Sequence, residues 1–421
     1  MRLLWVMNSP IGPAASILGQ AYGGASGGWI QSEYEALLKQ DVDFFVLSTL
    51  PSVKTGKILR KKNDMGELYC VHAPRVSSGI TVPLILRENV QQVIQQINPD
   101  VIHIWGTETW LSHEVSKCQT AAPKIIYIQG MIGVHRRYLG GYFGHLPEDR
   151  RYSKRRALMV RIKSIIRNHG FLRQAEIERE TIANCGNVIV DSDFARAYCA
   201  SVRPDIQCFQ HTLMPNQLFI HRTWQLEQCN RHSIFTVYGS SAEKGTQNLL
   251  KAVAIVKDSI PDITVLIPGI YDLDAQGSLL PGQKGSFQNV LYRMIQDYGL
   301  TEHVHFTGRL NAAQMAETME KCHLFVNPSC MEVHALSLRE AMVEGVPCIS
   351  AQCGSVAEYL RHRENGLMYR YEEYETLAYY IKMIFQSDEL ANRLSSNAVR
   401  AFEKMQKNDQ SLGQIYRVLQ H

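Results

Sequence analysis

The stretch from Asn327 to Pro347, NPSCMEVHALSLREAMVEGVP, constrains the fold of this chain more than any other. A short apolar run at 323–326 precedes it, and a second one at 348–350 follows it. The apolar residues between the two runs recur at helical spacing, which predicts a helix of about ten residues. A glycine and a proline end that helix, because glycine tolerates a left-handed turn and proline cannot continue a helix. The sequence therefore predicts a strand–loop–helix–strand unit of a parallel α/β domain.

Two carboxylates, Glu332 and Glu340, lie in the loop and in the helix of this unit. Units of this kind bind ligands at the carboxyl ends of their strands. The N–H groups of about His334 to Leu336 lack helical partners and carry partial positive charge, which suits a phosphate. A carboxylate would repel a phosphate, so we expect both carboxylates to accept hydrogen bonds from hydroxyls. Phosphates flanked by hydroxyls on both sides describe a nucleotide sugar.

The same stretch resembles the E-x7-E signature of retaining glycosyltransferases of the GT-B fold, in particular family 4, also called glycosyl transferases group 1. The flanking Asn-Pro-Ser, Glu-Ala-Met and Gly-Val-Pro support the resemblance. It implies that Glu332 contacts the donor sugar, that Glu340 contacts the ribose, and that backbone amides between them take the diphosphate. These amides belong to His334, Ala335 and Leu336. The alternative is a charged surface helix with an acidic cap.

One departure from the family pattern lies between the two glutamates. Members often carry Gly-Phe-Gly after the first glutamate, where this chain has Val333-His334-Ala335. The bulkier residues narrow the space over the phosphates.

A second loop, Gly239-Ser-Ser-Ala-Glu-Lys-Gly245, separates a predicted strand at 233–238 from a predicted helix at 248–257. It resembles the family's Gly-Arg-Leu-x-x-x-Lys-Gly loop, whose arginine and lysine neutralise the donor diphosphate. The resemblance assigns Lys244 to this role, which matters because the leaving nucleotide gains negative charge as the glycosidic bond breaks. A solvated loop lysine is the alternative. Ser240 replaces the arginine, so another basic residue supplies the second charge or the enzyme is weaker.

The segment Val304–Leu310 resembles the family's strand before the base-binding loop. The resemblance assigns the backbone of Arg309 and Leu310 to the nucleobase. Arg309 is also the candidate for the charge that Ser240 does not supply.

In the first half, a glycine-rich loop that contains Gly27 and Gly28 separates a predicted strand at 2–7 from a predicted helix at 29–39. The order resembles the first unit of a Rossmann domain, without the dinucleotide fingerprint. In GT-B enzymes this loop lies at the interdomain cleft and touches donor phosphate or acceptor. The alternative is a flexible turn.

Three polar residues are candidates for the acceptor side. Glu108 ends the predicted strand 99–108, which resembles the Pro-Asp-(Val/Ile)-Ile-His motif of family 4, and should point toward the cleft. Gln129 stands where many relatives carry a histidine, and glutamine cannot act as a base. His135 could substitute for that histidine. His103, within the predicted strand 99–108, could have either a structural or a functional role.

The segment 150–167 is basic and carries an apolar stripe at helical spacing. Such a helix can lie on an anionic membrane surface. It could also pack on the first domain with a solvated basic face, or bind a phosphorylated acceptor through its arginines. All three alternatives stay open.

Composition excludes several classes of protein. The net charge of +4 is too small to indicate nucleic-acid binding, and the 10 cysteines contain no Cys-x-x-Cys pair. We expect no metal site, because GT-B enzymes use protein charges and the Asp272-Leu-Asp274 pair reads as an acidic loop. No cofactor is expected. The amino end lacks the pattern of a signal peptide, so we expect a cytoplasmic protein, with the inner face of the membrane as a further location.

The sequence as a whole predicts an α/β protein of the GT-B fold, with two Rossmann-like domains facing across a cleft. We expect an acceptor-side domain at 1–210, a nucleotide-sugar-binding domain at 211–400, and a helix at 401–421 that crosses back to the first domain. The expected function is metal-independent, retaining transfer of a hexose from a nucleotide diphosphate sugar to a glycan or lipid-linked acceptor of the cell-surface polysaccharide or lipopolysaccharide type. The alternatives are a catalytically weak partner subunit and another GT-B enzyme, such as a nucleotide-sugar epimerase.

Overall fold

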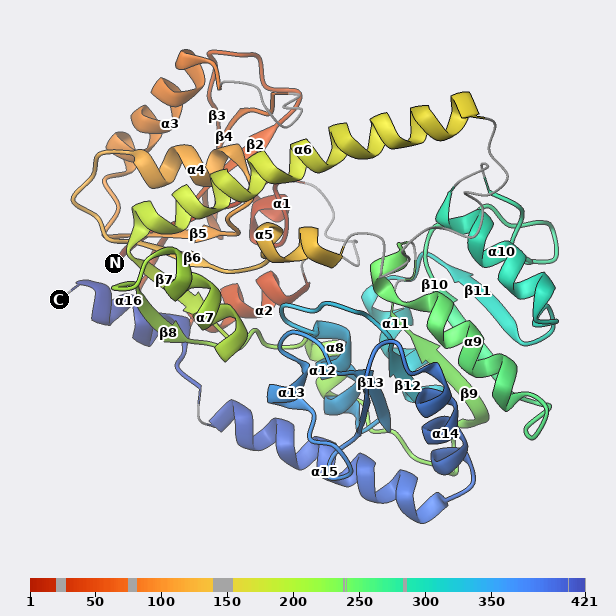
Figure 1. Ribbon diagram of the computed structural model, residues 1–421. Helices are drawn as coiled ribbons and strands as arrows, with labels where there is room; N and C mark the ends of the chain where they lie inside the picture. The colour runs from red at the N-terminus through yellow and green to blue at the C-terminus, as the bar shows by residue number, and fades with distance from the viewer. Residues whose placement is uncertain are drawn as a thin grey trace. The chain divides into compact units, whose positions relative to one another are not determined.

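The chain forms two compact units, each built on its own β-sheet (Figure 1). The computed structural model describes residues 1–19, 28–74, 82–138, 154–237, 239, 241–282, 286–407 and 409–420, with the backbone alone for 28–29 and 154–169. Unit 1 comprises Met1–Arg137, Leu158–Met214 and Asp409–His421, and unit 2 comprises Tyr138–Ala157 and Pro215–Asn408. The division near the middle of the chain thus follows Met214, four residues beyond the expected position.

Unit 1 contains an eight-stranded sheet in the order β3-β4-β2-β1-β5-β6-β7-β8. Neighbouring strands run parallel, except that β3 is antiparallel to β4. The central β1 has no exposed surface from Leu3 to Val6, as expected of a strand covered on both faces. The strands are β1 (Arg2–Val6), β2 (Asp43–Leu50), β3 (Leu59–Asn63), β4 (Gly66–His72), β5 (Val101–Trp105), β6 (Lys124–Tyr127), β7 (Asn187–Val190) and β8 (Gln207–Gln210).

The helices around this sheet differ from the expectation in two places. The short α1 precedes the glycine-rich loop, and one 32-residue helix, α6, contains the described part of the basic segment 150–167 and continues to Cys185. The basic side chains at 150–167 lie outside the described residues. The helices are α1 (Pro13–Leu18), α2 (Gly28–Leu37), α3 (Leu84–Ile97), α4 (Trp110–Lys117), α5 (Ile132–His135), α6 (Lys154–Cys185), α7 (Asp193–Val202) and α16 (Leu412–Gln420).

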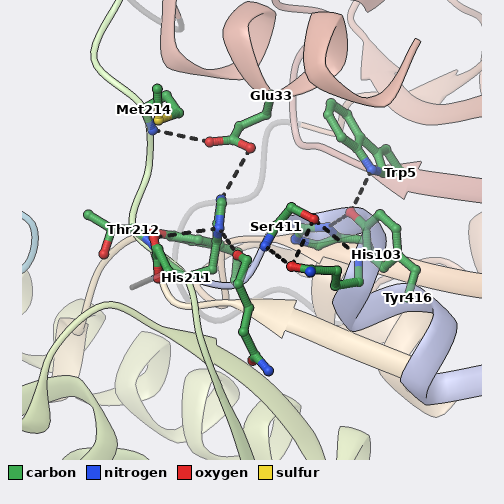
Figure 2. A network of polar contacts seen from close by, with 12 residues as sticks. Trp5, Glu33, His103, His211, Thr212, Met214, Ser411 and Tyr416 are labelled. Atoms are coloured by element: carbon green, nitrogen blue, oxygen red, sulfur yellow. Dashed lines mark hydrogen bonds and ion pairs between the residues drawn. The ribbon is translucent and has the colours of Figure 1, made fainter. Parts of the chain in front are cut away.

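The last helix, α16, belongs to unit 1, as expected of the carboxyl-terminal helix, but it spans Leu412–Gln420 rather than 401–421, because α15 (Asp388–Lys407) covers the first part of that range in unit 2. Tyr416 of α16 is fully buried, and its hydroxyl contacts Trp5 Nε1 at 3.1 Å and also His103 Nδ1 (Figure 2). Burial lowers the pKa of His103 well below its usual value, so its imidazole is neutral. His103 therefore has a structural role in anchoring α16.

Unit 2 contains a parallel six-stranded sheet in the order β11-β10-β9-β12-β13-β14. This is the strand order of a Rossmann domain, in which the chain runs outward from β9 in one direction and from β12 in the other. The strands are β9 (Asn230–Thr236), β10 (Thr264–Pro268), β11 (Val304–Gly308), β12 (Cys322–Asn327), β13 (Cys348–Ala351) and β14 (Leu367–Tyr369).

Nine helical segments of unit 2 lie in the described residues, and two of them correspond to the helices predicted at 248–257 and within 327–347. They are α8 (Gln217–Ile220), the 3-10 helix η3 (Ala242–Lys244), α9 (Thr246–Val256), α10 (Phe287–Asp297), α11 (Ala312–Lys321), α12 (Leu336–Glu344), α13 (Val356–Tyr359), α14 (Tyr374–Phe385) and α15 (Asp388–Lys407). The predicted central helix is α12, and Gly345 ends it in the left-handed conformation with φ of 81°. Across the described part of the chain, no helix is both long and apolar enough to cross a bilayer.

Candidate active site

The strand order of unit 2 brings together two loops that lie far apart in the sequence. β9 and β12 are neighbours, with Thr236 opposite Val326, and the loops that follow them leave the sheet at the same edge. Lys244 ends η3 in the first loop, and Glu332 lies in the second. The Nζ atom of Lys244 lies 2.7 Å from Oε1 of Glu332. The reversal point of the sheet, where open α/β sheets bind ligands, thus carries an ion pair between two predicted site residues.

Backbone contacts fix the position of both loops. The N–H of Cys330 donates to the carbonyl of Glu243 at 2.9 Å. Gly245, with φ of 73°, lies so close to Pro328 that a Cβ atom there would be 1.9 Å from the Pro328 carbonyl oxygen. Only glycine allows this approach, so the glycine after Lys244 is required to bring the loops into contact.

Glu332 is held from its other side by the loop after β13. The N–H of Ser355 donates to the Glu332 carbonyl at 3.1 Å. A Cβ atom at Gly354, where φ is 47°, would lie 1.9 Å from the same carbonyl oxygen. No role was predicted for Gly354. Its contact with Glu332 depends on strand pairing, for which the sequence carries no local signal.

The electrostatics of the pair favour a charged lysine. Burial lowers the pKa of Lys244, but the nearby Glu332 carboxylate more than offsets this and raises the pKa above its usual value. The side chain of Lys244 keeps 33% of its surface exposed and that of Glu332 keeps 14%. A cation that is charged, partly accessible and held by one carboxylate can exchange that partner for an anionic ligand.

α12 begins shortly after Glu332 in the chain, at the end of the stretch from His334 to Leu336 that was predicted to bind phosphate. The helix begins at Leu336, and Ala335 precedes it with φ of 45° and ψ of 44°. The amides that point out of the first turn are therefore those of Leu336, Ser337 and Leu338. The predicted phosphate seat, at about the amides of His334 to Leu336, thus shares Leu336 with the first turn, because the left-handed turn at Ala335 delays the start of the helix.

Glu340 lies on α12, four residues after its start, and remains partly exposed. Burial raises the pKa of Glu340 to about 7, and the adjacent Arg339 opposes this shift. Its carboxyl group is thus close to half-protonated at neutral pH. In this form the carboxyl group can accept a hydrogen bond from a hydroxyl, and when protonated it can also donate one to a hydroxyl.

In the described part of unit 2, no hydrogen bond or ion pair joins Arg309 or Leu310 to Lys244 or Glu332. Arg309 and Leu310 follow β11, which is separated from β9 by β10, and Arg309 is exposed. Ser240 and Gly27 lie outside the described residues, and Gly28 is the first residue of α2. Asp274 accepts hydrogen bonds from the amides of Gln276 and Ser278, so this carboxylate shapes a turn.

Two of the three acceptor-side candidates converge in unit 1. A Cβ atom at Gly106, where φ is 85°, would lie 3.0 Å from Oε2 of Glu108 and 3.1 Å from Oε1 of Gln129. Both side chains therefore reach the end of β5. His135, the third candidate, is the last residue of α5. Glu108 alone of these three lines a cavity of about 690 Å³ at this edge of the sheet.

The comparisons with known proteins agree with this arrangement. The family described as glycosyl transferases group 1 matches residues 226–401, which cover the ion pair and α12. An uncharacterized glycosyltransferase of Bacillus subtilis (strain 168), YqgM, is 24% identical over 165 residues, or 39% of this chain and 42% of that relative. The match thus spans about two fifths of the length of the curated relative.

Two solved structures resemble the whole chain. Sucrose-phosphate synthase from Thermosynechococcus elongatus is 18% identical, with a TM-score of 0.68 over 100% of this chain and 99% of that one. HepE of Anabaena, in complex with UDP and glucose, is 16% identical, with a TM-score of 0.64 over 99% and 100%. The fold is therefore GT-B, and residues 226–401 match the family described as glycosyl transferases group 1.

Proposed function

We propose that the protein is a retaining glycosyltransferase of family 4, which transfers a hexose from a nucleotide diphosphate sugar to a hydroxyl of a glycan or lipid-linked acceptor. The observation that carries this proposal is the Lys244–Glu332 pair at the strand reversal of unit 2, followed at once by α12. The glycosyl transferases group 1 match over the same residues supports it. The complex of HepE with UDP and glucose supports a nucleotide sugar as donor.

Each residue of the site has a role that suits its chemistry. The Lys244 ammonium and the first-turn amides of α12 stabilise the negative charge that develops on the leaving diphosphate. Glu332 accepts hydrogen bonds from the donor sugar, and Glu340 from the ribose. We propose that these protein groups, without a metal ion, supply the charge stabilisation.

The transfer exchanges one bond for another at the anomeric carbon. The acceptor oxygen forms a bond to this carbon on the face from which the phosphate oxygen departs, which retains the anomeric configuration. The proton of the acceptor hydroxyl passes to the departing phosphate, so no side-chain base is required and Gln129 does not prevent catalysis. We propose an acceptor of the polysaccharide or lipopolysaccharide type.

The donor panel provides the direct test. Purified protein is incubated with UDP-, GDP- and ADP-hexoses, and release of the nucleoside diphosphate is measured with and without bacterial cell-surface glycans. We expect turnover with one nucleotide, loss of turnover in Lys244→Met, and normal turnover in the control Lys257→Met, a lysine at the far end of α9. Tight nucleotide binding without turnover under all conditions would favour the partner-subunit alternative. An absence of nucleotide binding would exclude the proposal.

A further inference from the structure

Glu178, on the long helix α6 (Figure 1), has no exposed surface although it carries a carboxylate. The amide of Ile132 donates to its Oε2 atom at 2.8 Å, and the amide of Gly133 donates to its Oε1 atom at 3.0 Å. The Thr107 hydroxyl donates to Oε2 at 3.2 Å, and the Tyr198 hydroxyl donates to Oε1. Four donors thus converge on one buried carboxylate.

These donors come from segments that follow neighbouring strands of unit 1. Thr107 follows β5, and the amides of Ile132 and Gly133 belong to α5, which follows β6. Tyr198 lies on α7, which follows β7. β5 and β6 are adjacent and parallel, so the segments after them leave the sheet at the same edge. Glu178 therefore joins these two segments to each other and to α7.

The same two segments carry the predicted acceptor-side residues. Thr107 links Glu108 to Glu178, because its amide donates to Oε2 of Glu108 at 2.8 Å while its hydroxyl donates to Glu178. α5 begins three residues after Gln129, ends with His135, and is held by Glu178 at its first two residues. The positions of these residues therefore depend on segments that Glu178 contacts.

The backbone of α5 approaches the carboxylate so closely that a side chain would interfere. A Cβ atom at Gly133 would lie 2.6 Å from the Tyr198 hydroxyl and 3.4 Å from Oε1 of Glu178. A larger residue at this position would displace the Tyr198 hydroxyl from the carboxylate. The glycine thus keeps α5 and α7 within hydrogen-bonding distance of the same group.

The burial of Glu178 costs free energy that an apolar residue of similar volume would not cost. Among the residues that the structure describes, its hydrogen-bond partners are four neutral donors and no cation. Burial raises the pKa of Glu178, and the four hydrogen bonds oppose this effect. A buried network of this kind fixes one arrangement of its partners, since other arrangements leave the carboxylate unpaired. That cost favours a function that requires one defined geometry of the two segments.

We propose that Glu178 is a positioning residue for the acceptor, which holds the segments after β5 and β6 so that Glu108 and Gln129 meet the acceptor in one geometry. It acts through Thr107 and α5 and does not itself touch the substrate. The inference rests on the proposed glycosyltransferase function, because it concerns acceptor handling in that reaction. Donor binding, which is proposed for unit 2, should not depend on Glu178.

The test compares variants of the full-length protein. Glu178→Gln removes the charge with little change of shape, and Tyr198→Phe and Thr107→Val each remove one hydroxyl donor. Glu67→Gln is the matched control, because Glu67 is a buried carboxylate of unit 1 that Arg60 contacts. It lies on β4, and both β2 and β1 separate β4 from β5. The control therefore disturbs a buried carboxylate away from the acceptor-side segments.

For each variant we measure transfer to octyl glycosides of glucose, galactose, mannose and N-acetylglucosamine, donor hydrolysis without acceptor, and the Kd for UDP. Glu178→Gln should lower kcat/KM for the octyl glycoside by about tenfold to hundredfold, because displaced segments misalign the acceptor, while donor hydrolysis and UDP affinity stay within about twofold. The two hydroxyl variants should show smaller losses in the same direction. Glu67→Gln should lower Tm but leave kcat/KM for the octyl glycoside within about twofold.

Hydrogen exchange measured by mass spectrometry tests the anchoring without turnover. Peptides that cover 105–112 and 128–137 should exchange faster in Glu178→Gln but not in Glu67→Gln, because exchange reports local opening. If Glu178→Gln does not fold, Tyr198→Phe and Thr107→Val decide by the same criteria.

The proposal is overturned if a folded Glu178→Gln exchanges normally in both segments, if it keeps its kcat/KM for the octyl glycoside, or if donor hydrolysis falls as much as transfer does. Where no octyl glycoside serves as acceptor, normal exchange in Glu178→Gln overturns the proposal by itself. An absence of all turnover in the unmodified protein would instead count against the proposed function, and hydrogen exchange would still decide whether Glu178 holds the two segments.

Discussion

The ion pair between Lys244 and Glu332 shows how two site residues can restrain each other before a ligand arrives. In the 2.7 Å contact, the Glu332 carboxylate balances the positive charge of the lysine that is proposed to hold the diphosphate. A diphosphate that takes over Lys244 would free the Glu332 carboxylate to accept hydroxyls of the sugar. Donor binding would therefore break one charge-assisted contact and form two.

This restraint leads to a prediction for Glu332→Gln. The variant should bind UDP more tightly than the unmodified protein, by roughly threefold to tenfold, because Lys244 no longer has a competing anionic partner. It should at the same time lose sugar transfer with its fold intact. Isothermal titration calorimetry measures the affinity, with Glu302→Gln, an exposed acid of unit 2, as a control for the lost charge. Equal or weaker UDP binding in Glu332→Gln would contradict the restraint.

At the scale of elements, the residue just before α12 has a left-handed backbone conformation that glycine adopts more readily than alanine does. Ala335 adopts φ of 45°, ψ of 44° while 3% exposed, at the position where many family 4 members have the second glycine of Gly-Phe-Gly. The left-handed region costs an alanine roughly 1–2 kcal/mol, whereas glycine adopts it without that cost.

Ala335→Gly should therefore stabilise the protein. The gain should be about 0.5–1 kcal/mol, since the greater entropy of glycine in the unfolded chain offsets part of the relieved strain. Thermal unfolding should show an increase in Tm of about 1–4 °C. Ala341→Gly, in the middle of the same helix, is the matched control and should destabilise. A lower Tm for Ala335→Gly would mean that the left-handed turn carries little strain.

The same helix carries Glu340, whose titration predicts a pH dependence of stability. Its folded pKa of about 7 lies above the usual value of 4.5, so the native state binds this proton more tightly than the unfolded chain does. The resulting stabilisation is fully present below pH 4.5 and is lost as the pH rises through 7.

Glu340→Gln should remove this loss, because the glutamine stays neutral at every pH. We expect the variant to exceed the unmodified protein in urea stability at pH 8 by on the order of 1–3 kcal/mol, and to show little difference at pH 4.5. Glu403→Gln on the exposed face of α15 controls for the charge change. A pH-independent difference would mean that Glu340 is ionised throughout. Nucleotide affinity of Glu340→Gln should fall, which reports separately on the ribose contact.

At the scale of the whole molecule, the chain leaves unit 1 after Met214 and returns to it at Asp409. The two segments at these points are attached to unit 1 at one buried cluster (Figure 2). His211 Nε2 lies 3.1 Å from Glu33, and its Nδ1 contacts the Gln410 carbonyl at 2.7 Å and Asp409 at 3.8 Å. The N–H of Met214 donates to Glu33 at 3.1 Å. One histidine thus holds both connecting segments.

The protonation of His211 in this cluster should make the stability of unit 1 depend on pH. Burial lowers the pKa of His211. The nearby carboxylates of Glu33 and Asp409 and the Gln410 carbonyl more than offset this effect and raise the pKa above its usual 6.5. The stabilisation from the protonated ring is fully present below pH 6.5 and is lost as the pH rises through the folded pKa.

His211→Gln should therefore be destabilising, and more so in acid. We expect a loss of about 3 kcal/mol or more at pH 6, because Glu33 is left buried without a cationic partner, and a smaller loss at pH 9. Urea unfolding at the two pH values measures this difference, with His221→Gln, an exposed histidine, as the control. The same loss at both pH values would show that His211 is neutral in the folded protein.

Local patterns in the sequence predicted most strands and several helices of unit 2, and they indicated Lys244 and Glu332, which the structure brings into contact, as candidate site residues. The spacing of apolar positions predicted α12 and the strands around it, and the family resemblance identified Lys244, Glu332 and Glu340. Unit 1 was predicted less fully, since β3, β4 and α1 carry no motif. The apolar spacing of α3, with Leu86, Val90, Val93, Ile94 and Ile97 buried, was a signal for a helix that the prediction missed. Of the cavity that Glu108 lines, the sequence indicated only this residue, because the rest of the lining comes from strand ends and helices that are distant in the sequence.

The sequence by itself determined most of the strands and helices of unit 2 and which side chains are candidates for the chemistry, because periodicity, turn residues and motif spacing act between near neighbours in the chain. Only the tertiary structure decided that Lys244 meets Glu332 across 88 residues, that Gly354 presses on Glu332, and that Ala335 takes a left-handed turn. It also decided the protonation of Glu340 and His211. Strand pairing and burial set these features, and both arise from the sum of contacts between segments that the sequence keeps far apart.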